Sequence, residues 1–198
     1  MKKIFTIICI LALGLNLQAQ DVNEKLSEAQ SEYKSGNLEN ARFALQEALQ
    51  FINQAIGREV LEMLPTQLGD MTKLDTDDNV TGTTALFAGL FINRRYASEK
   101  SNASIEIMSD SPLITSINAF MSLPAIMVTD PNQKRIKVDN YRGMLTKSKD
   151  TEGVVSYNAQ IPIGSTLFTF NTTGIADEKT VTDYLNQLQI GKIAKFAE

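Results

Sequence analysis

One stretch constrains the fold of this chain more than any other: Ala85–Tyr96, with the sequence ALFAGLFINRRY. Side chains alternate between the two faces of a β-strand, and here both sets stay apolar as far as Ile92. A run of this kind is typical of a strand that is covered on both faces, because a strand with one wet face alternates apolar and polar residues. The sequence therefore predicts a central strand over Ala85–Tyr96 with packed layers above and below it.

Helices are expected before this strand. Apolar residues spaced three and four apart predict helical segments at Asp21–Lys34, Leu38–Ile56 and Arg58–Leu64. Gly36 supplies a stop between the first two, and Asn37 is a candidate N-cap for the second. Gly57 is expected to break or kink that helix, and Pro65 ends the segment. The next residues, Thr66–Thr84, are the least regular part of the chain and are expected to form a loop.

Patterns after the central strand predict more strands and two more helices. Strands with alternating apolar residues are expected at Ala103–Ser109, Lys134–Val138, Tyr141–Ser148, Val154–Ile163 and Thr166–Thr172. One helix is expected after Ser111, and a last helix after Asp177, each of these residues being a candidate N-cap. Gly191–Phe196 is expected to form a short terminal segment. Short turns between strands favour antiparallel pairing, so the predicted fold class is α+β, with a mainly antiparallel sheet, helices on both faces and an N-terminal helical hairpin.

The first nineteen residues have the features of a secretory signal peptide. Lys2 and Lys3 form a positive region, Ile4–Leu15 is apolar, and Ala19 ends a plausible cleavage site. The apolar run is shorter than the roughly 20 residues that span a bilayer. We therefore expect an exported protein, periplasmic or secreted, with no transmembrane span after cleavage. The expected organisation is a signal peptide (1–19), a helical hairpin region (20–64) and an α+β sandwich domain (65–198).

Composition excludes several classes of function. The chain has no histidine, and its one cysteine, Cys9, lies in the predicted signal peptide. Nucleophilic Ser-His-Asp or Cys-His catalysis, haem ligation by histidine and zinc sites of thiolate or imidazole are therefore excluded from the mature chain. The net charge is −4, which argues against nucleic acid as a partner, because such partners need a basic surface.

Two pairs of residues are candidates for ligand binding. Arg94 and Arg95 end the central strand and face opposite ways, so one of them could bind an anion or pair with a buried acid, while strand-end charges commonly reach solvent. Tyr141 and Arg142 lie in the predicted hairpin Lys134–Lys149, which is the basic part of an acidic chain. Charges on such a hairpin prevent edge-to-edge pairing or offer a docking patch for an acidic partner.

An acidic loop is a candidate calcium site. Asp75, Asp77 and Asn79 match the first three ligand positions of an EF-hand loop. The pattern then fails, because Val80 stands where glycine is required and Leu86 stands where the bidentate glutamate is required. A solvated turn is the alternative interpretation.

The predicted hairpin resembles the core of one tetratricopeptide repeat. The resemblance rests on Tyr33-Lys34-x-Gly36-Asn37-Leu38-x-x-Ala41, followed by Ala44-Leu45-x-x-Ala48-Leu49. In that family small residues allow two helices to pack closely. The resemblance implies a hairpin that docks another protein. A plain helical hairpin packed on its own domain remains the alternative.

The order of elements is similar to that of the Mog1/PsbP-like α/β/α sandwich. The resemblance rests on Leu64-Pro65 and Gly69 before the sheet, on Arg95-Tyr96, on the strand-to-helix stretch Ile105–Pro112, and on the late strands before Val181–Leu188. It implies a small accessory or binding protein. No functional residue can be transferred, because no motif matches position by position.

The sequence thus favours a non-enzymatic binding or accessory module of the bacterial envelope. Its expected partner is another envelope protein or a small ligand, with no cofactor and no catalytic residue assigned. One alternative is a carboxylate-based hydrolase that uses Asp75, Asp77 or Asp78. Another is a binding module stabilised by calcium.

Overall fold

The computed structural model describes residues 21–81, 89–109, 113–122 and 130–197. The helices are α1 (residues 21–34), α2 (Leu38–Met63), α3 (Leu113–Ser122), α4 (Glu178–Gln187) and α5 (Ile190–Ala197). The strands are β1 (Gln67–Leu68), β2 (Met71–Lys73), β3 (Asn79–Thr81), β4 (Phe91–Ala97), β5 (Asn102–Ser109), β6 (Gln133–Val138), β7 (Tyr141–Lys149), β8 (Val155–Ile163) and β9 (Thr166–Thr173). The predicted signal peptide lies outside the described residues.

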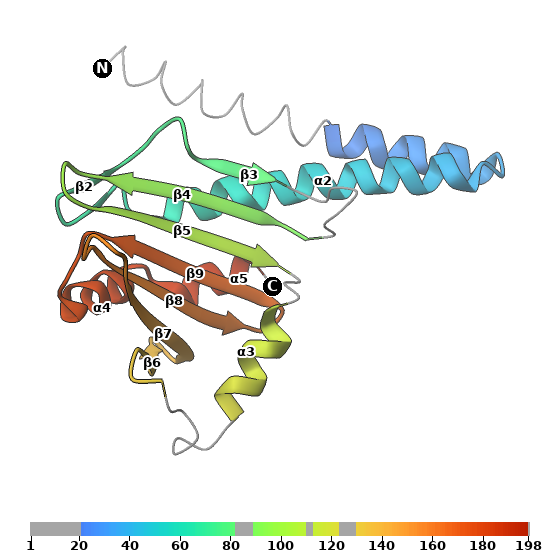
Figure 1. Cartoon of the computed structure of the whole chain (residues 1–198). Helices are drawn as coiled ribbons and strands as arrows, with labels where there is room; N and C mark the ends of the chain where they lie inside the picture. Colours follow the sequence, from blue (N-terminus) through green and yellow to red (C-terminus); the bar gives the residue numbers. More distant parts are fainter. Residues whose placement is uncertain (1–20, 82–88, 110–112, 123–129, 198) are drawn as a thin grey trace, which may run out of the picture.

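These strands form one antiparallel sheet, which confirms the predicted α+β class (Figure 1). Their order is β1-β2-β4-β5-β9-β8-β7-β6, and β3 also pairs with β4. The pairing of β5 with β9 runs the whole length of both strands, from Asn102 opposite Thr173 to Ser109 opposite Thr166. This pairing joins the first strands of the sheet to the meander β6-β7-β8-β9 and makes one continuous surface.

Helices cover both faces of the sheet. Figure 1 shows α2, α4 and α5 behind the strands and α3 in front of the ends of β8 and β9. The main core lies on the side of α2, α4 and α5, where Ile105, Phe168 and Phe170 of the sheet and Leu185 of α4 are fully buried. Burying each such side chain contributes roughly 1.5–3 kcal/mol. None of the described helices is both long and apolar enough to cross a membrane.

The central strand is shorter than its apolar run. Strand β4 begins at Phe91, after a bend at Gly89, and residues 82–88 of the predicted strand lie outside the described residues. Ile92 and Tyr96 are buried in the main core, whereas Phe91 on the other face is half-buried. The prediction of a strand from Ala85 therefore gave the right element with a start that is not confirmed.

Helix α2 corrects two predictions. It runs without interruption from Leu38 to Met63, so Gly57 does not break it. Gly57 instead lies against Val80 of β3, and a Cβ atom at this position would overlap the valine side chain. Asn37 stands at the N-cap position, but its side chain makes no capping hydrogen bond and donates to Glu32 Oε2 at 2.8 Å. Because Val60 and Leu64 belong to the core of the sheet, the hairpin region and the sandwich domain share one core.

Three short strands and a helix were not predicted. Residues 66–84, expected as a loop, contain β1, β2 and β3, which are two or three residues long. The terminal segment expected at Gly191–Phe196 is part of helix α5. The prediction for α4 is confirmed, because the Asp177 carboxylate caps the helix by accepting hydrogen bonds from the main-chain N–H groups of Lys179 and Thr180.

Candidate functional site

Arg94 and Arg95 point to opposite faces of β4, as predicted, and their surroundings differ. Arg94 is 5% exposed and lies on the core face beneath the end of α2. Arg95 is exposed on the other face, where its Nη1 lies 3.3 Å from Asp77 Oδ2. The two cations therefore cannot act together on one ligand.

Arg94 is fully engaged by its own chain. Its Nε and Nη2 donate to the two carboxylate oxygens of Asp78, at 2.8 and 2.5 Å. Its Nη1 donates to the main-chain oxygens of Leu61 and Leu64, two of the carbonyls that a helix leaves without partners at its C-terminal end. Burial lowers the pKa of Arg94, but the hydrogen bond and charge of Asp78 outweigh it and raise the pKa above its ordinary value. Of the two roles open to this residue, the geometry supports pairing with an acid, the half-buried Asp78.

The acidic loop does not gather its side chains around one point. Asp75 pairs with Lys73 at 2.6 Å, Asp77 pairs with Arg95, and Asn79 accepts a hydrogen bond from Thr81. The hydrogen bond from Lys73 lowers the pKa of Asp75. Among the described residues no three acidic side chains lie close enough together to hold a metal ion. Each predicted carboxylate thus faces a cation of its own chain.

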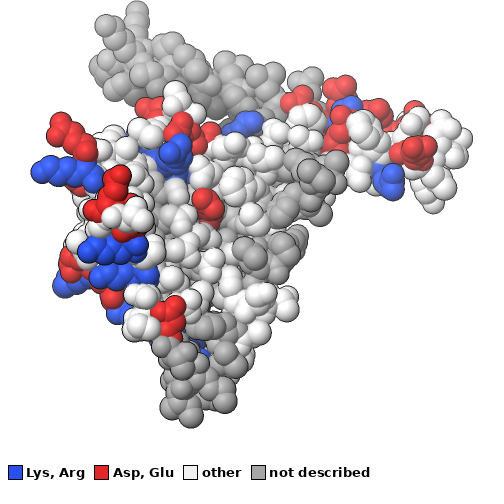
Figure 2. All heavy atoms as spheres, viewed as in Figure 1, with Lys and Arg blue, Asp and Glu red and all other residues white. Residues whose placement is uncertain are grey.

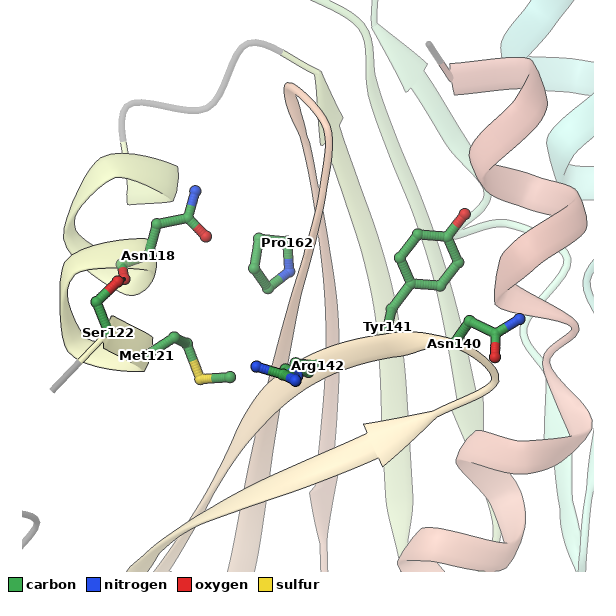
Figure 3. A pocket seen from close by; sticks show the side chains of 7 residues that line it. All are labelled: Asn118, Met121, Ser122, Asn140, Tyr141, Arg142 and Pro162. Atoms are coloured by element: carbon green, nitrogen blue, oxygen red, sulfur yellow. Dashed lines mark hydrogen bonds between the residues drawn. The ribbon is translucent and has the colours of Figure 1, made fainter. Parts of the chain in front are cut away.

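The other predicted pair, Tyr141 and Arg142, lines a cavity of about 450 Å³ between α3 and the turn of the β6–β7 hairpin (Figure 3). The remaining lining residues are Asn118, Met121, Ser122, Asn140 and Pro162. Figure 3 shows the Arg142 and Met121 side chains pointing toward each other across this space, while the Tyr141 ring lies on the far side of the strand. Arg142 is therefore the charged group of the cavity, and Tyr141 borders it from the opposite face of the sheet.

The basic residues of the β6–β7 hairpin divide between the two faces of the sheet. On the core side, Lys134 pairs with Glu178 of α4, and Lys147 Nζ lies 5.6 Å from the centroid of the Tyr157 ring. On the other side, Lys137 lies directly across from Arg142 in the β6–β7 ladder. Neither Lys137 nor Arg142 forms a side-chain hydrogen bond or ion pair within the described part of the chain. Of the predicted basic patch, Lys137 and Arg142 are therefore the cations that we assign to the cavity.

A second candidate site is the helical hairpin of α1 and α2, whose outer half extends beyond the sheet (Figure 1). Seven large apolar side chains of the described residues are exposed, and all seven lie on this hairpin: Leu26, Tyr33, Leu38, Phe43, Leu45, Leu49 and Ile52. Their exposed fractions range from 41% for Ile52 to 69% for Tyr33. Concentrated exposure of this kind is typical of interaction surfaces, whereas single scattered apolar residues are ordinary, so the hairpin is a candidate site.

The line along which α1 and α2 pack against each other, which we call the seam, is the reference for the positions of these side chains. Ala29 of α1 and Ala44 and Ala48 of α2 are buried, and small residues of this kind allow two helices to pack closely. Lys25 and Glu47 form an ion pair at 2.9 Å between the two helices. Hydrogen bonds to Glu28 and Glu47 raise the pKa of Lys25, so this link stays charged at any physiological pH.

Helical spacing places six of the seven exposed residues along one edge of this seam, opposite the edge that carries the Lys25–Glu47 ion pair. In α1, Leu26 stands on the side of Ala29 away from Lys25, and in α2, Leu45 stands on the side of Ala48 away from Glu47. Because the Lys25–Glu47 pair marks one edge of the seam, the leucines lie along the opposite edge. This set, which we call the apolar edge, consists of Leu26, Tyr33, Leu38, Leu45, Leu49 and Ile52.

Figure 2 shows how charge is distributed on the face that carries α3. Acidic and basic side chains gather toward the left of the view and on the hairpin at its upper right, and the middle of the sheet carries few charges. Polar residues there bond across strands, since Asn158 donates to Asn171 at 2.6 Å and Asn171 donates to Ser104 at 3.2 Å. These side chains satisfy one another, so they offer a weaker case for a binding site than the apolar edge.

Sequence reasoning found the hairpin but did not find the apolar edge. The stripes that predicted α1 and α2 include Leu26, Tyr33, Leu45 and Leu49, and an apolar stripe normally indicates the buried side of a helix. The signal was present in the length of α2, because a helix of 26 residues reaches beyond a sheet of ordinary strands. A search of family models, of curated proteins and of solved structures found no match to this chain.

Proposed function

We propose that this protein is an exported, non-enzymatic binding module that docks an amphipathic helix of a partner protein on the apolar edge. The observation that carries the proposal is the exposure of six large apolar side chains along one side of the hairpin seam. Exposing such side chains to water is unfavourable, by about 25 cal/mol for each Å² of apolar surface. A partner that covers the edge recovers this free energy.

The course of α2 supports a helix as the occupant. Ile56, Val60 and Leu64 follow Ile52 at intervals of four residues and pack into the core of the sheet domain. Towards the N-terminus the same apolar stripe continues through Leu49 and Leu45 without a cover. The groove between two antiparallel helices accepts a third helix through apolar residues spaced three and four apart.

Charge supports a particular kind of helix. The acidic residues of the exposed half of the hairpin lie away from the apolar edge by helical spacing: Glu24, Glu28, Glu32, Glu39 and Glu47. The two cations beside the edge are Lys34 and Arg42, and neither has an ion-pair partner in the described part of the chain. The partner helix is therefore expected to carry carboxylates beside its apolar stripe.

Export is the second part of the proposal. The basic residues Lys2 and Lys3, the apolar run that follows them and the small residue Ala19 support a cleaved secretory leader. We place the protein in the bacterial envelope on this basis. The absence of histidine, together with the pairing of Asp75, Asp77 and Asp78 with cations, favours binding over carboxylate-based hydrolysis.

The test compares two exposed apolar positions on the same helix. A photo-crosslinking amino acid is placed at Leu49, on the apolar edge, or at Phe43, which lies on another side of α2. In envelope extract we expect a product from position 49 alone, joined to a peptide with an apolar stripe flanked by acids. A synthetic peptide of that sequence should gain helicity on binding, and Leu45→Glu should weaken its affinity by about tenfold or more.

Three outcomes would count against the proposal. One is equal crosslinking at positions 43 and 49, and another is a crosslinked peptide that gains no helicity on binding. The third is a crosslink to a second copy of the chain, accompanied by a dimer in light scattering, which would make the apolar edge a self-association surface. Phe43→Glu is the matched control for Leu45→Glu, because the two residues are similarly exposed.

A further inference from the structure

We infer that the cavity between α3 and the β6–β7 hairpin binds a small molecule that carries a carboxylate or phosphate group, held by Arg142 and Lys137. The inference is independent of the apolar edge, which lies on a different part of the molecule. It begins from the arrangement of charge on the two strands. Lys137 and Arg142 are directly opposite each other in the antiparallel β6–β7 ladder and so project from the same face.

Two like charges directly opposite each other on paired strands destabilise a sheet. An ordinary surface relieves this repulsion with a nearby carboxylate, but within the part of the chain that the structure describes neither cation has a carboxylate as an ion-pair partner. No Asp or Glu occurs in α3, β7, β8 or β9. The nearest acid along the chain is Asp139 in the turn, and its carboxylate is directed to α5, where it accepts a hydrogen bond from the Gly191 main-chain N–H at 3.0 Å.

The turn itself is fixed, which sets the position of both cations. Asp139 adopts a positive φ of 51°, as both type I′ and type II′ hairpin turns require of their first central residue. Its hydrogen bond to Gly191 holds the turn against α5. On the core side, Val138 is buried, so the strand that carries Lys137 cannot rotate its charge inward.

The cavity supplies the rest of a site. Arg142 lines it together with the amide side chains of Asn118 and Asn140, which can bond the neutral part of a ligand. Met121 and Pro162 supply apolar contacts. The volume of about 450 Å³ falls within the range of roughly 300–1,000 Å³ found for small-molecule sites. A planar guanidinium binds a carboxylate or phosphate at two points, and the adjacent ammonium adds a second charge.

The experiment titrates the purified protein with sodium phosphate and with sodium citrate, and with sodium chloride at matched ionic strength as the reference. Backbone amide shifts in NMR spectra report where each anion binds. We expect a saturable response centred on residues 137–143 and on α3 for at least one oxyanion and none for chloride. Arg142→Gln and Lys137→Gln should each weaken that response by about tenfold.

The matched control is Arg58→Gln. Arg58 is an exposed arginine on α2, distant in the chain from the cavity, so its loss removes the same charge without touching the proposed site. Equal weakening by Arg58→Gln and Arg142→Gln would show general attraction to a cation and would overturn the inference. An equal response to chloride and to both oxyanions would do the same. A response to phosphate alone, or to citrate alone, supports the site and identifies its preferred anion.

Discussion

Arg94 binds Asp78 at two points, with Nε 2.8 Å from Oδ1 and Nη2 2.5 Å from Oδ2. The same guanidinium donates to the main-chain oxygens of Leu61 and Leu64. One buried cation therefore joins strand β4, the segment before β3 and the last turn of α2. This connection holds the base of the hairpin on the sheet domain, so it determines how the apolar edge is presented.

Removing the acid should be costly. In Asp78→Asn the Arg94 charge stays buried without its counter-charge, and the free energy of unfolding should fall by about 3 kcal/mol. Urea denaturation measures this change. Asp77→Asn is the neighbouring control, since its partner Arg95 is 60% exposed and the pair should contribute less than about 1 kcal/mol. Similar losses in the two variants would contradict the structural role assigned to Arg94.

Gly57 should resist a substitution that a helix normally favours. Alanine is better than glycine in a helix interior by about 1 kcal/mol, but here its Cβ would overlap Val80 of β3. We expect Gly57→Ala to lower the free energy of unfolding by about 1–3 kcal/mol. In the double variant with Val80→Ala, part of that loss should be recovered, and a double-mutant cycle measures the coupling. A stabilising Gly57→Ala would show that the helix and the strand can separate at little cost.

The strands that local pattern predicted are the ones with a long alternating run. In β8, Tyr157, Ala159, Ile161 and Ile163 face the core as their spacing indicates, and Pro162 lies past the last residue paired with β7, as a strand-end proline should. Strands β1, β2 and β3 were missed because two or three residues cannot show a period. The pairing of β5 with β9 was also beyond prediction, because nothing in either strand specifies a partner so distant in the chain.

The candidate sites also combine features that local sequence pattern predicts with features that depend on strand register or burial. Arg142 was predicted from the charge of its hairpin, but its position opposite Lys137 depends on the register of β6 and β7. The Arg94–Asp78 pair depends on the register of β3 and β4, which the sequence does not specify. The apolar edge was missed because periodicity shows that Leu45 and Leu49 share a side of the helix, but it does not show whether anything covers them.

Tyr96 should make the protein sensitive to alkaline pH. Burial raises the pKa of its hydroxyl to about 12, against an opposing effect of Arg94, and the hydroxyl donates to the Pro65 main-chain oxygen at 2.8 Å. The folded-state pKa lies above the unfolded value of about 10, so this contribution to stability is full below pH 10 and is lost as the pH rises through 12. In this range the folded protein holds one more proton at Tyr96 than the unfolded protein does. Tyr96→Phe should remove this one-proton contribution to the slope of the free energy of unfolding with pH.

The measurement is urea denaturation at a series of alkaline pH values, with tyrosinate absorbance followed in parallel. At neutral pH, Tyr96→Phe should cost about 1 kcal/mol, because the Pro65 carbonyl loses its donor. The control is Tyr33→Phe, because Tyr33 is 69% exposed. This substitution should leave the free energy of unfolding at neutral pH and its slope at alkaline pH unchanged. An unaltered alkaline slope in Tyr96→Phe would contradict the assignment.

Lys137 should change the sign of its effect on stability when an oxyanion is added. In chloride at low ionic strength, Lys137→Gln relieves repulsion from Arg142 and should stabilise the protein by about 0.2–1 kcal/mol. In phosphate or citrate the wild-type cation pair binds the anion, and binding to the folded state stabilises it by mass action. The variant loses this gain, so wild type should become the more stable of the two. Lys192→Gln, on the exposed side of α5, should show no such reversal in thermal melting. If Lys137→Gln is the less stable protein in chloride as well, the lysine has a structural role. This result would contradict the assignment of Lys137 and Arg142 to an anion-binding site.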